Sequence, residues 1–192
     1  MQHKPLILAF DTSAAHCAAA LLLGDRIVTR VDEMAKGQAE HLMPMLEEML
    51  RAEGLSWADL DGIGVGMGPG NFTGIRISLA AARGLSLGLG KPAIGVNGFE
   101  ARAYEEALPY IATIPAPRGQ SYAQSFPETG NPSEPELRAR EAGPQKPPHM
   151  LIAATARIAA SRLATNHARP APLYIRSADA APPRDPAPVL LP

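Results

Sequence analysis

Residues 63–90 read IGVGMGPGNFTGIRISLAAARGLSLGLG. The first five residues predict a short buried strand, the glycine and proline corner after them a tight turn, and the rest, from about Asn71, a helix. Glycines at 66, 68 and 70 leave backbone N–H groups uncovered beside a helix N-terminus, and this geometry suits an anion such as phosphate. The same glycines also suit a plain strand-to-helix turn. Both interpretations stay open at the level of sequence.

The predicted helix has a smooth surface. Gly84 and Gly88 stand four residues apart, next to Ala80, Ala81 and Ala82. Each glycine costs about 1 kcal/mol relative to alanine inside a helix. Small side chains on one face allow a second helix to approach closely, so this helix is suited to helix packing.

The elements around this stretch alternate in a recognisable order. They are strands at 6–10, 17–23 and 26–31, a helix at about 38–52, a strand at 93–96 and a helix at 98–108. Gly24 and Asp25 join the second and third strands in a predicted hairpin. The predicted order is therefore three strands, a helix, a strand, a helix, and then one more strand and helix. One lobe of an actin or ribonuclease H type fold has this order.

The helix at about 38–52 has one apolar face and one charged face. Because Pro44 is tolerated in a first helical turn, we expect the true start near His41. The apolar positions at helical spacing are Leu42, Met45, Leu46, Met49 and Leu50. A methionine-rich face is usually core but also suits a partner surface. His41 is expected to be a polar or capping residue, because no second ligand follows at metal-binding spacing.

Asp11 follows the first strand and has two interpretations. A carboxylate at a strand end can face the metal of a nucleotide, and an Asp before a turn can accept a hydrogen bond from its own backbone as an Asx-turn. The second interpretation is favoured.

The second half of the chain is rich in proline. Of the 20 prolines, 15 lie between Pro115 and Pro192. The expected elements are paired strands at 110–114 and 120–126, a loop at 128–148, a helix at 150–164 and an extended, partly mobile tail from Pro170. We therefore predict one lobe at 1–108 and a shortened, proline-rich second lobe at 109–192.

Composition excludes several classes of protein. A net charge of −1 over 192 residues lacks the basic field of an independent nucleic-acid binder. The single cysteine, Cys17, fits a reducing compartment. The sequence has no apolar run long enough to suggest a membrane span, so we expect a cytoplasmic protein. The chain has no P-loop motif and no histidine pair at metal-binding spacing, so neither a P-loop nucleotide site nor a metal is expected.

Five segments of the chain resemble the bacterial TsaB (YeaZ) family. They are FDTS at 10–13, HLMPML at 41–46, GMGPGNFTGIRI at 66–77, KPAIGV at 91–96 and PLYIR at 172–176. The resemblance implies an α/β, actin-like (ASKHA, ribonuclease H-like) fold of two lobes, here with a contracted second lobe. It also implies a non-catalytic subunit that supports the catalytic TsaD protein, with TsaE as an ATPase partner.

The reaction implied by the resemblance is the transfer of a threonylcarbamoyl group to N6 of adenosine 37 in tRNAs that read ANN codons. The complex would use ATP and threonylcarbamoyl-adenylate, while this subunit alone would bind no cofactor and would meet tRNA only indirectly. Without its partner the chain would form a homodimer. The catalytic relatives carry a His-x-x-x-His metal pair where this chain has Gly98 and Arg102, so no catalytic or metal-binding residue is expected here.

A ligand role for the cleft between the lobes is only weakly indicated. Family members tend to have a segment like Asp-Ala-Arg-Arg-Gly-Glu where this chain reads PAPRGQ at 115–120. The candidate cofactor-binding residues are Asp11, Thr12, Gly68, Gly70, Thr73 and Arg118.

The leading prediction is a helix-mediated scaffold. The expected partner interface comprises His41, Leu42, Met45, Leu46, Met49, Arg76, Leu79, Ala80, Arg83, Gly84 and Leu87. One alternative is an actin-like ATPase or phosphotransferase that uses Asp11, Thr12 and the glycine turn. A less favoured alternative is a peptidase, for which Ser13, Ser78, Ser86 and Ser121 show no evident arrangement of His and Asp.

Overall fold

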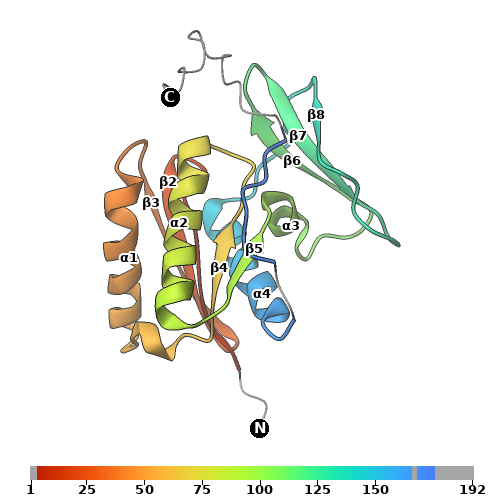
Figure 1. The fold of residues 1–192 in the computed structure, drawn as a ribbon. Helices are drawn as coiled ribbons and strands as arrows, with labels where there is room; N and C mark the ends of the chain where they lie inside the picture. Colours follow the sequence, from red (N-terminus) through yellow and green to blue (C-terminus); the bar gives the residue numbers. More distant parts are fainter. Residues whose placement is uncertain (1–3, 166–167, 176–192) are drawn as a thin grey trace, which may run out of the picture.

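The computed structural model describes residues 4–165 and 168–175, and its larger sheet has five strands in the order β3-β2-β1-β4-β5 (Figure 1). The strands are β1 (Leu6–Asp11), β2 (His16–Leu23), β3 (Arg26–Glu33), β4 (Gly62–Gly66) and β5 (Ala93–Val96). β1, β2 and β3 are antiparallel neighbours, whereas β4 lies parallel to β1 and β5 parallel to β4. The predicted actin-like order of elements is confirmed.

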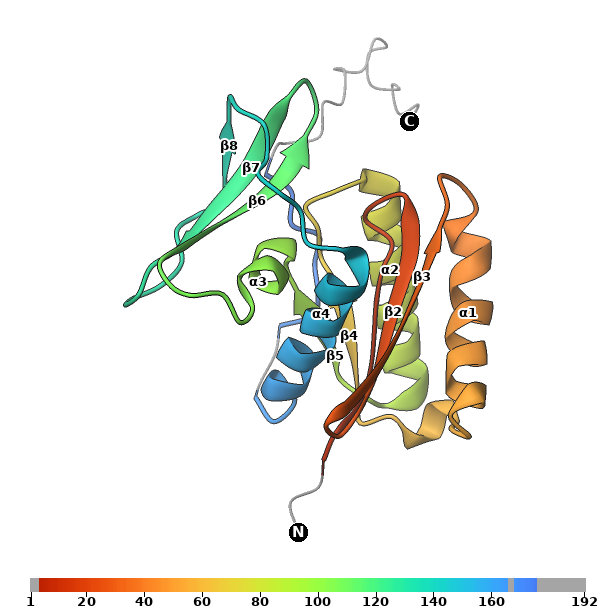
Figure 2. The same cartoon turned by 180° about the vertical axis from the view of Figure 1, so that it is seen from behind.

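Helices cover both faces of this sheet. Successive side chains of β1 point to opposite faces, and Ile7, Leu8, Ala9 and Phe10 are all fully buried. Leu8 and Phe10 pack under α1 (Gln38–Ala52) and α2 (Phe72–Leu89), while Ile7 and Ala9 pack under α4 (Pro148–Arg162). Figures 1 and 2 show these two layers on opposite sides of the sheet. Full burial of each large apolar side chain contributes about 1.5–3 kcal/mol, so β1 is the centre of the core.

The predicted helix at 38–52 is confirmed as α1. The later start that we expected near His41 is wrong, because the helix begins at Gln38 and Pro44 lies inside it. Proline has no N–H, so Pro44 cannot donate the helical hydrogen bond to the carbonyl oxygen of Glu40. Both residues are exposed to solvent. Water can therefore satisfy that carbonyl, and the proline is tolerated without a break.

The second sheet has three strands, in the order β6-β7-β8. These are β6 (Tyr110–Ala116), β7 (Gln120–Phe126) and β8 (Glu136–Arg138). The hairpin of β6 and β7 confirms the predicted pair. β8 lies inside the segment predicted to be a loop, which is a correction: three proline-free residues are enough for a short edge strand.

Two further helical predictions need new boundaries. α3 (Gly98–Ala103) is shorter than the predicted helix at 98–108, because the chain turns at Glu105, whose φ of 59° is left-handed. Asn97 caps α3 by accepting hydrogen bonds from the N–H groups of Phe99 and Glu100. The predicted helix at 150–164 is α4, which starts two residues earlier because proline fits the first turn.

The packing of α4 crosses the predicted lobe division at residue 108. The small sheet belongs wholly to the range 109–192, whereas α4, from the same range, covers the large sheet. The boundary itself stays a prediction. Residues 170–175 of the predicted tail form no helix or strand, and the rest of the tail lies outside the described residues. Among the residues that the structure describes, no helix combines the length and hydropathy needed to cross a bilayer.

Candidate functional site

The glycine corner between β4 and α2 is packed directly against the turn that follows β1. A Cβ on Gly66 would overlap the carboxylate of Asp11, and a Cβ on Gly74 would overlap the carbonyl oxygen of Thr12. Gly68 adopts a φ of 85°, which glycine takes without strain. Glycine is therefore needed here for close approach of two backbones and for one left-handed turn.

The start of α2 is already satisfied by protein atoms. The N–H of Asn71 donates to the carbonyl oxygen of Ser13 at 2.7 Å, and the N–H of Gly74 donates to Oδ1 of Asn71 at 2.8 Å. Thr12, which is fully buried, donates through Oγ1 to the carbonyl oxygen of Gly74 at 2.6 Å. Two amide donors that an anion would require are thus occupied, which favours the plain turn over the phosphate site.

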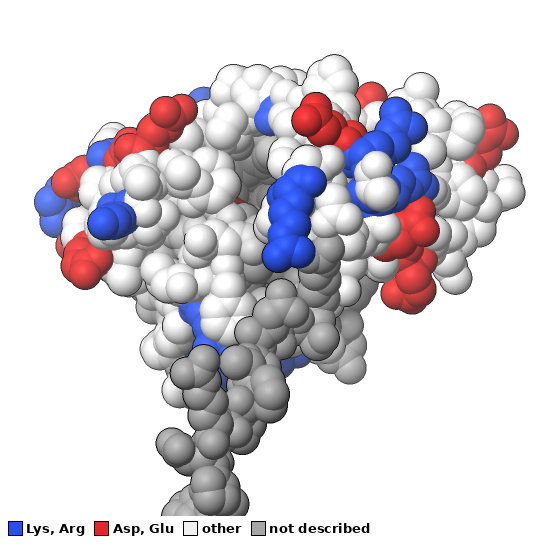
Figure 3. All heavy atoms as spheres, turned by 90° about the horizontal axis from the view of Figure 1, so that it is seen from above, with Lys and Arg blue, Asp and Glu red and all other residues white. Residues whose placement is uncertain are grey.

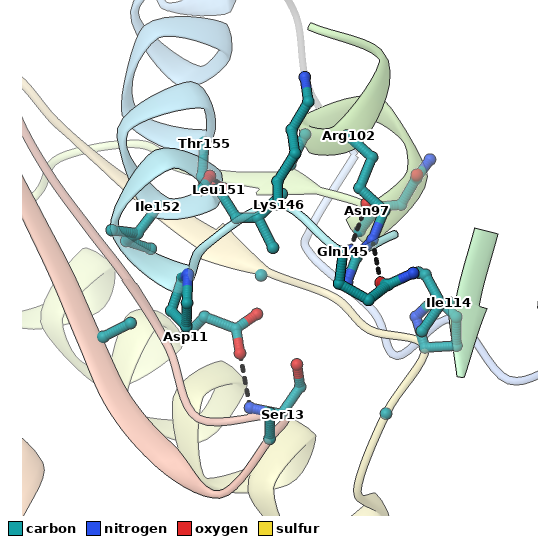
Figure 4. Close-up of a pocket in the computed structure, with 18 of the residues that line it drawn as sticks. Asp11, Ser13, Asn97, Arg102, Ile114, Gln145, Lys146, Leu151, Ile152 and Thr155 are labelled. Atoms are coloured by element: carbon teal, nitrogen blue, oxygen red, sulfur yellow. Dashed lines mark hydrogen bonds between the residues drawn. The ribbon is translucent and has the colours of Figure 1, made fainter. Parts of the chain in front are cut away.

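Asp11 forms the expected Asx-turn and also faces a cavity. Its Oδ1 accepts a hydrogen bond from the N–H of Ser13 at 2.5 Å (Figure 4). The carboxylate points into a cavity of about 620 Å³ enclosed by the β1–β2 turn, α3, the small sheet and the start of α4. From above, this hollow opens between the two halves of the molecule (Figure 3). A cavity of this size accommodates a small-molecule ligand.

Arg102 supplies a positive charge to the same cavity. Its Nη1 donates to the carbonyl oxygen of Gly98 at 2.9 Å and its Nε to Oε1 of Gln145 at 3.2 Å (Figure 4). Burial lowers the pKa of the Arg102 guanidinium, and the nearby charge of Asp11 opposes this shift. A hydrogen bond therefore joins Gly98 and Arg102, the two positions at which the family resemblance led us to expect no metal. Lys146, at the rim, pairs with Glu106 at 2.5 Å.

The six candidate cofactor-binding residues do not form one site. Asp11 and Gly70 line the cavity, while Thr73 lines a different groove on α2. Thr12 is sealed in the core, Gly68 forms the turn, and Arg118 lies in the β6–β7 turn with a φ of 62°. No group of three or more His, Cys, Asp or Glu side chains at metal-binding distance occurs within residues 4–165 and 168–175.

The four serines proposed for a peptidase are dispersed. Ser78 and Ser86 donate to backbone carbonyl oxygens of their own surroundings, and Ser121 is buried in β7. Ser13 shares the cavity with His16 and Asp11, yet no hydrogen bond joins the His16 ring to either residue in the described part of the chain. This arrangement does not support a peptidase.

A second feature is an apolar groove between α1 and α2, which we call the helix groove. Its upper part is lined by Ala39, Leu42, Met43, Phe72, Thr73, Arg76, Ile77, Ala80 and Ala81, and its lower part by Met43, Trp57, Ala81, Gly84, Leu85, Gly88 and Leu89. Met43 and Ala81 belong to both parts, so the two parts adjoin along the two helices. Space above Gly84 and Gly88 is open, because a Cβ on either would meet no atom within 4 Å.

The residues predicted to form the partner interface fall into two groups by burial, and the interface itself stays a prediction. Five of its members, Leu42, Met45, Leu46, Met49 and Leu79, are at most 6% exposed and belong to the core under α1 and α2. A helical apolar stripe faces the chain's own sheet first, so these five residues serve the core, and of them only Leu42 also lines the helix groove. The remaining six are exposed or half-buried.

Three of those six, Arg76, Arg83 and His41, are engaged within the chain, Arg76 with Phe72 and Tyr174. Arg83 donates through Nε to the carbonyl oxygen of Pro170 at 2.9 Å, so it holds the C-terminal segment and is not a free rim residue. His41 contacts Oδ2 of Asp32 at 2.7 Å through Nε2, which fits the expected polar role. Hydrogen bonds from Arg30 first, and from His41, hold the pKa of Asp32 below its ordinary value.

Sequence reasoning missed two exposed apolar residues and one half-buried apolar residue that line the helix groove. Met43 is 37% exposed and Phe72 is 42% exposed, while Ile77 is half-buried. Met43 falls among the charged positions of α1, and that isolated apolar residue on a polar face was the available signal.

Comparison with known proteins identifies one matching family model and several similar proteins. Residues 32–132 match the model of the family described as TsaD, tRNA N6-adenosine threonylcarbamoyltransferase. The chain is 31% identical over 130 residues to the tRNA threonylcarbamoyladenosine biosynthesis protein TsaB of Escherichia coli K12, covering 65% of this chain and 56% of that protein. It is 31% identical over 120 residues to a tRNA N6-adenosine threonylcarbamoyltransferase of Erythrobacter litoralis, covering 54% of this chain and 35% of that protein.

Solved structures show the same fold. YeaZ from Pseudomonas aeruginosa superposes with a TM-score of 0.69 at 24% identity, over 88% of this chain and 99% of that chain. The chain spans about half the length of the E. coli relative, at 56%, and a smaller share of the E. litoralis one.

The five-stranded sheet and its two helix layers define an actin-like protein. The matched family model covers just over half of the chain, so the chain belongs to the family that this model describes as TsaD, and it is similar to proteins named TsaB and YeaZ.

Proposed function

We propose that this chain is a non-catalytic subunit of the machinery that makes N6-threonylcarbamoyladenosine in tRNA. In this proposal it docks through the helix groove onto the equivalent helices of the catalytic TsaD protein. The observation that carries the proposal is the apolar helix groove, whose two adjoining parts lie along α1 and α2, with open space above Gly84 and Gly88. Small residues on one helix face permit the close approach of helices from a partner.

The cavity supports the non-catalytic part of the proposal. The family resemblance places Gly98 and Arg102 at the positions of the metal-binding histidines of the catalytic relatives, and neither a hydrogen nor a guanidinium replaces an imidazole ligand. TsaE, ATP, threonylcarbamoyl-adenylate and tRNA would then be handled by the complex as a whole. In the absence of TsaD the same groove would pair two copies of this chain.

The deciding experiment compares two arginine substitutions on the paired helices. Ala80→Arg places a bulky cation in the groove, whereas Ala52→Arg places the same side chain at an exposed position on α1 that does not line it. Affinity for the catalytic subunit of the same organism is measured by calorimetry, with circular dichroism to check the fold. We expect Ala80→Arg to weaken binding at least about tenfold, which is about 1.4 kcal/mol, and Ala52→Arg to leave it unchanged. Equal affinities for both variants would refute the docking assignment.

A second candidate function rests on the cavity beside Asp11. Its volume of about 620 Å³ is sufficient for a nucleotide, which favours an actin-like ATPase or phosphotransferase as the alternative. Such an enzyme must bind ATP by itself. Titration of the isolated chain with ATP and Mg²⁺ separates the two functions, because a scaffold subunit gives no heat of binding and a phosphotransferase does.

A further inference from the structure

The segment 168–175 follows α4 in the chain and lies along α2, to which it is hydrogen-bonded through Arg83. The carbonyl oxygen of buried Pro170 accepts hydrogen bonds from Nε and Nη2 of Arg83, the first at 2.9 Å. The N–H of Leu173 donates to the carbonyl oxygen of Met67 at 2.9 Å, just before the glycine corner. We call this segment the strap. Figure 1 shows it beside α2 and β5, far in sequence from both.

Alternate side chains of the strap have different surroundings. Leu173 and Ile175 pack against the apolar cluster of the small sheet, which contains Phe99 and Ile114. Tyr174, between them, is 41% exposed. The strap is therefore held by its backbone and by its two aliphatic residues, and the ring of Tyr174 is not needed to keep it in place.

Tyr174 belongs to an exposed stack with two residues of α2. Its ring lies 5.3 Å from that of Phe72, with an angle of 26° between the planes. The guanidinium carbon of Arg76 lies 3.9 Å from the centre of the Phe72 ring, and Nε of Arg76 donates to the hydroxyl of Tyr174 at 3.4 Å. Phe72 is 42% exposed, so the stack presents two aromatic rings and a cation to solvent.

This stack is continuous with the helix groove. Phe72 and Arg76 line the upper part of the groove, and the stack joins Tyr174 to that end. Tyrosine and arginine are enriched among the residues that carry most of the binding energy of interfaces, and stacking restricts these side chains before binding. An occupant of the upper groove therefore meets a rigid aromatic surface that includes the strap.

We propose that the strap is a third docking element for the catalytic subunit and that Tyr174 is an anchor residue of the contact. This inference rests on the proposed function, since the occupant is the same TsaD-type protein that binds the helix groove. The chain would thus be recognised through its two helices and through a residue about 100 positions away in sequence from Phe72.

The test uses the full chain and three substitutions, with affinity for the catalytic subunit measured by calorimetry. Tyr174→Ala removes the ring and should weaken binding about tenfold or more, whereas Tyr174→Phe keeps the ring and should bind within about threefold of the wild type. Ile111→Ala, at a 50% exposed apolar residue of the small sheet that does not line the groove, is the control and should bind normally. Normal binding by Tyr174→Ala would overturn the inference.

Two further measurements distinguish failure of the strap inference from misfolding of a variant and from failure of the proposed function. Hydrogen exchange of the wild-type chain should slow at residues 171–175 when the catalytic subunit is added, and unchanged exchange there would also overturn the inference. If Ala80→Arg abolishes binding while Tyr174→Ala does not, the strap proposal fails and the groove proposal stands. If neither substitution affects binding, both fail.

Discussion

At the scale of single residues, contacts with the backbone decide which glycines are replaceable. Gly66 has the carboxylate of Asp11 against its Cα, so Gly66→Ala forces that side chain out of the Asx-turn with Ser13. We expect a loss of about 1–3 kcal/mol in unfolding free energy, measured by urea denaturation. Gly88→Ala is the matched control, because its Cβ enters open space and an alanine in a helix should stabilise by up to about 1 kcal/mol. Equal effects of the two variants would contradict this account.

The lowered pKa of Asp32 predicts that the unfolding free energy of the chain depends on pH. Because hydrogen bonds from Arg30 and His41 hold its folded pKa below the unfolded value, its contribution is present above the unfolded pKa of about 3.9 and is lost as the pH falls through the folded pKa. Asp32→Asn should therefore reduce unfolding free energy at pH 6, by at most about 1 kcal/mol, and have a smaller effect below pH 3. Urea denaturation at both pH values measures this. A penalty that grows on acidification would have the opposite sign and would disprove the assignment.

At the scale of elements, α1 carries a core residue and an exposed residue of the helix groove only two positions apart. Met45 is 1% exposed and Met43 is 37% exposed. Met45→Ala should reduce unfolding free energy by about 2–5 kcal/mol because it leaves a cavity, whereas Met43→Ala should change it by about 0.5 kcal/mol or less. Met43→Ala should instead weaken binding of the catalytic subunit. Thermal unfolding and calorimetry on both variants check this, and similar stability losses would contradict the assigned faces.

The surface of α2 yields a complementary prediction. An alanine at Gly84 meets no neighbouring atom within 4 Å, so Gly84→Ala should raise the unfolding free energy of the isolated chain by up to about 1 kcal/mol. The added methyl group should weaken partner binding if a helix packs closely there. A variant that is more stable and binds as well as the wild type would show that close approach does not occur at Gly84. Ala52→Arg serves again as the binding control.

At the scale of the whole molecule, α4 completes the core of a sheet that precedes it by more than 50 residues. Ile152, Ala156 and Ala159 of α4 cover Ile7, Ala9 and the other residues of that face. A chain ending at residue 146 should therefore expose this face, bind hydrophobic dyes and lose its cooperative urea transition. Adding residues 147–165 as a separate peptide should restore the transition. A cooperative transition in the shortened chain alone would show that α4 is dispensable.

The sequence by itself determined the elements and their order, because apolar periodicity, glycine corners and prolines act locally. It identified the αβ pattern up to β5, the Asx-turn at Asp11 and the smooth face of α2. It did not determine which side of each amphipathic element remained exposed, because Leu42, Met45, Leu46, Met49 and Leu79 look like any apolar stripe until a sheet lies beneath them. Only the tertiary structure placed α4 on the large sheet, Arg102 in the same cavity as Asp11 and Tyr174 on Phe72, since chain folding brings these groups together over long separations, which no local pattern encodes.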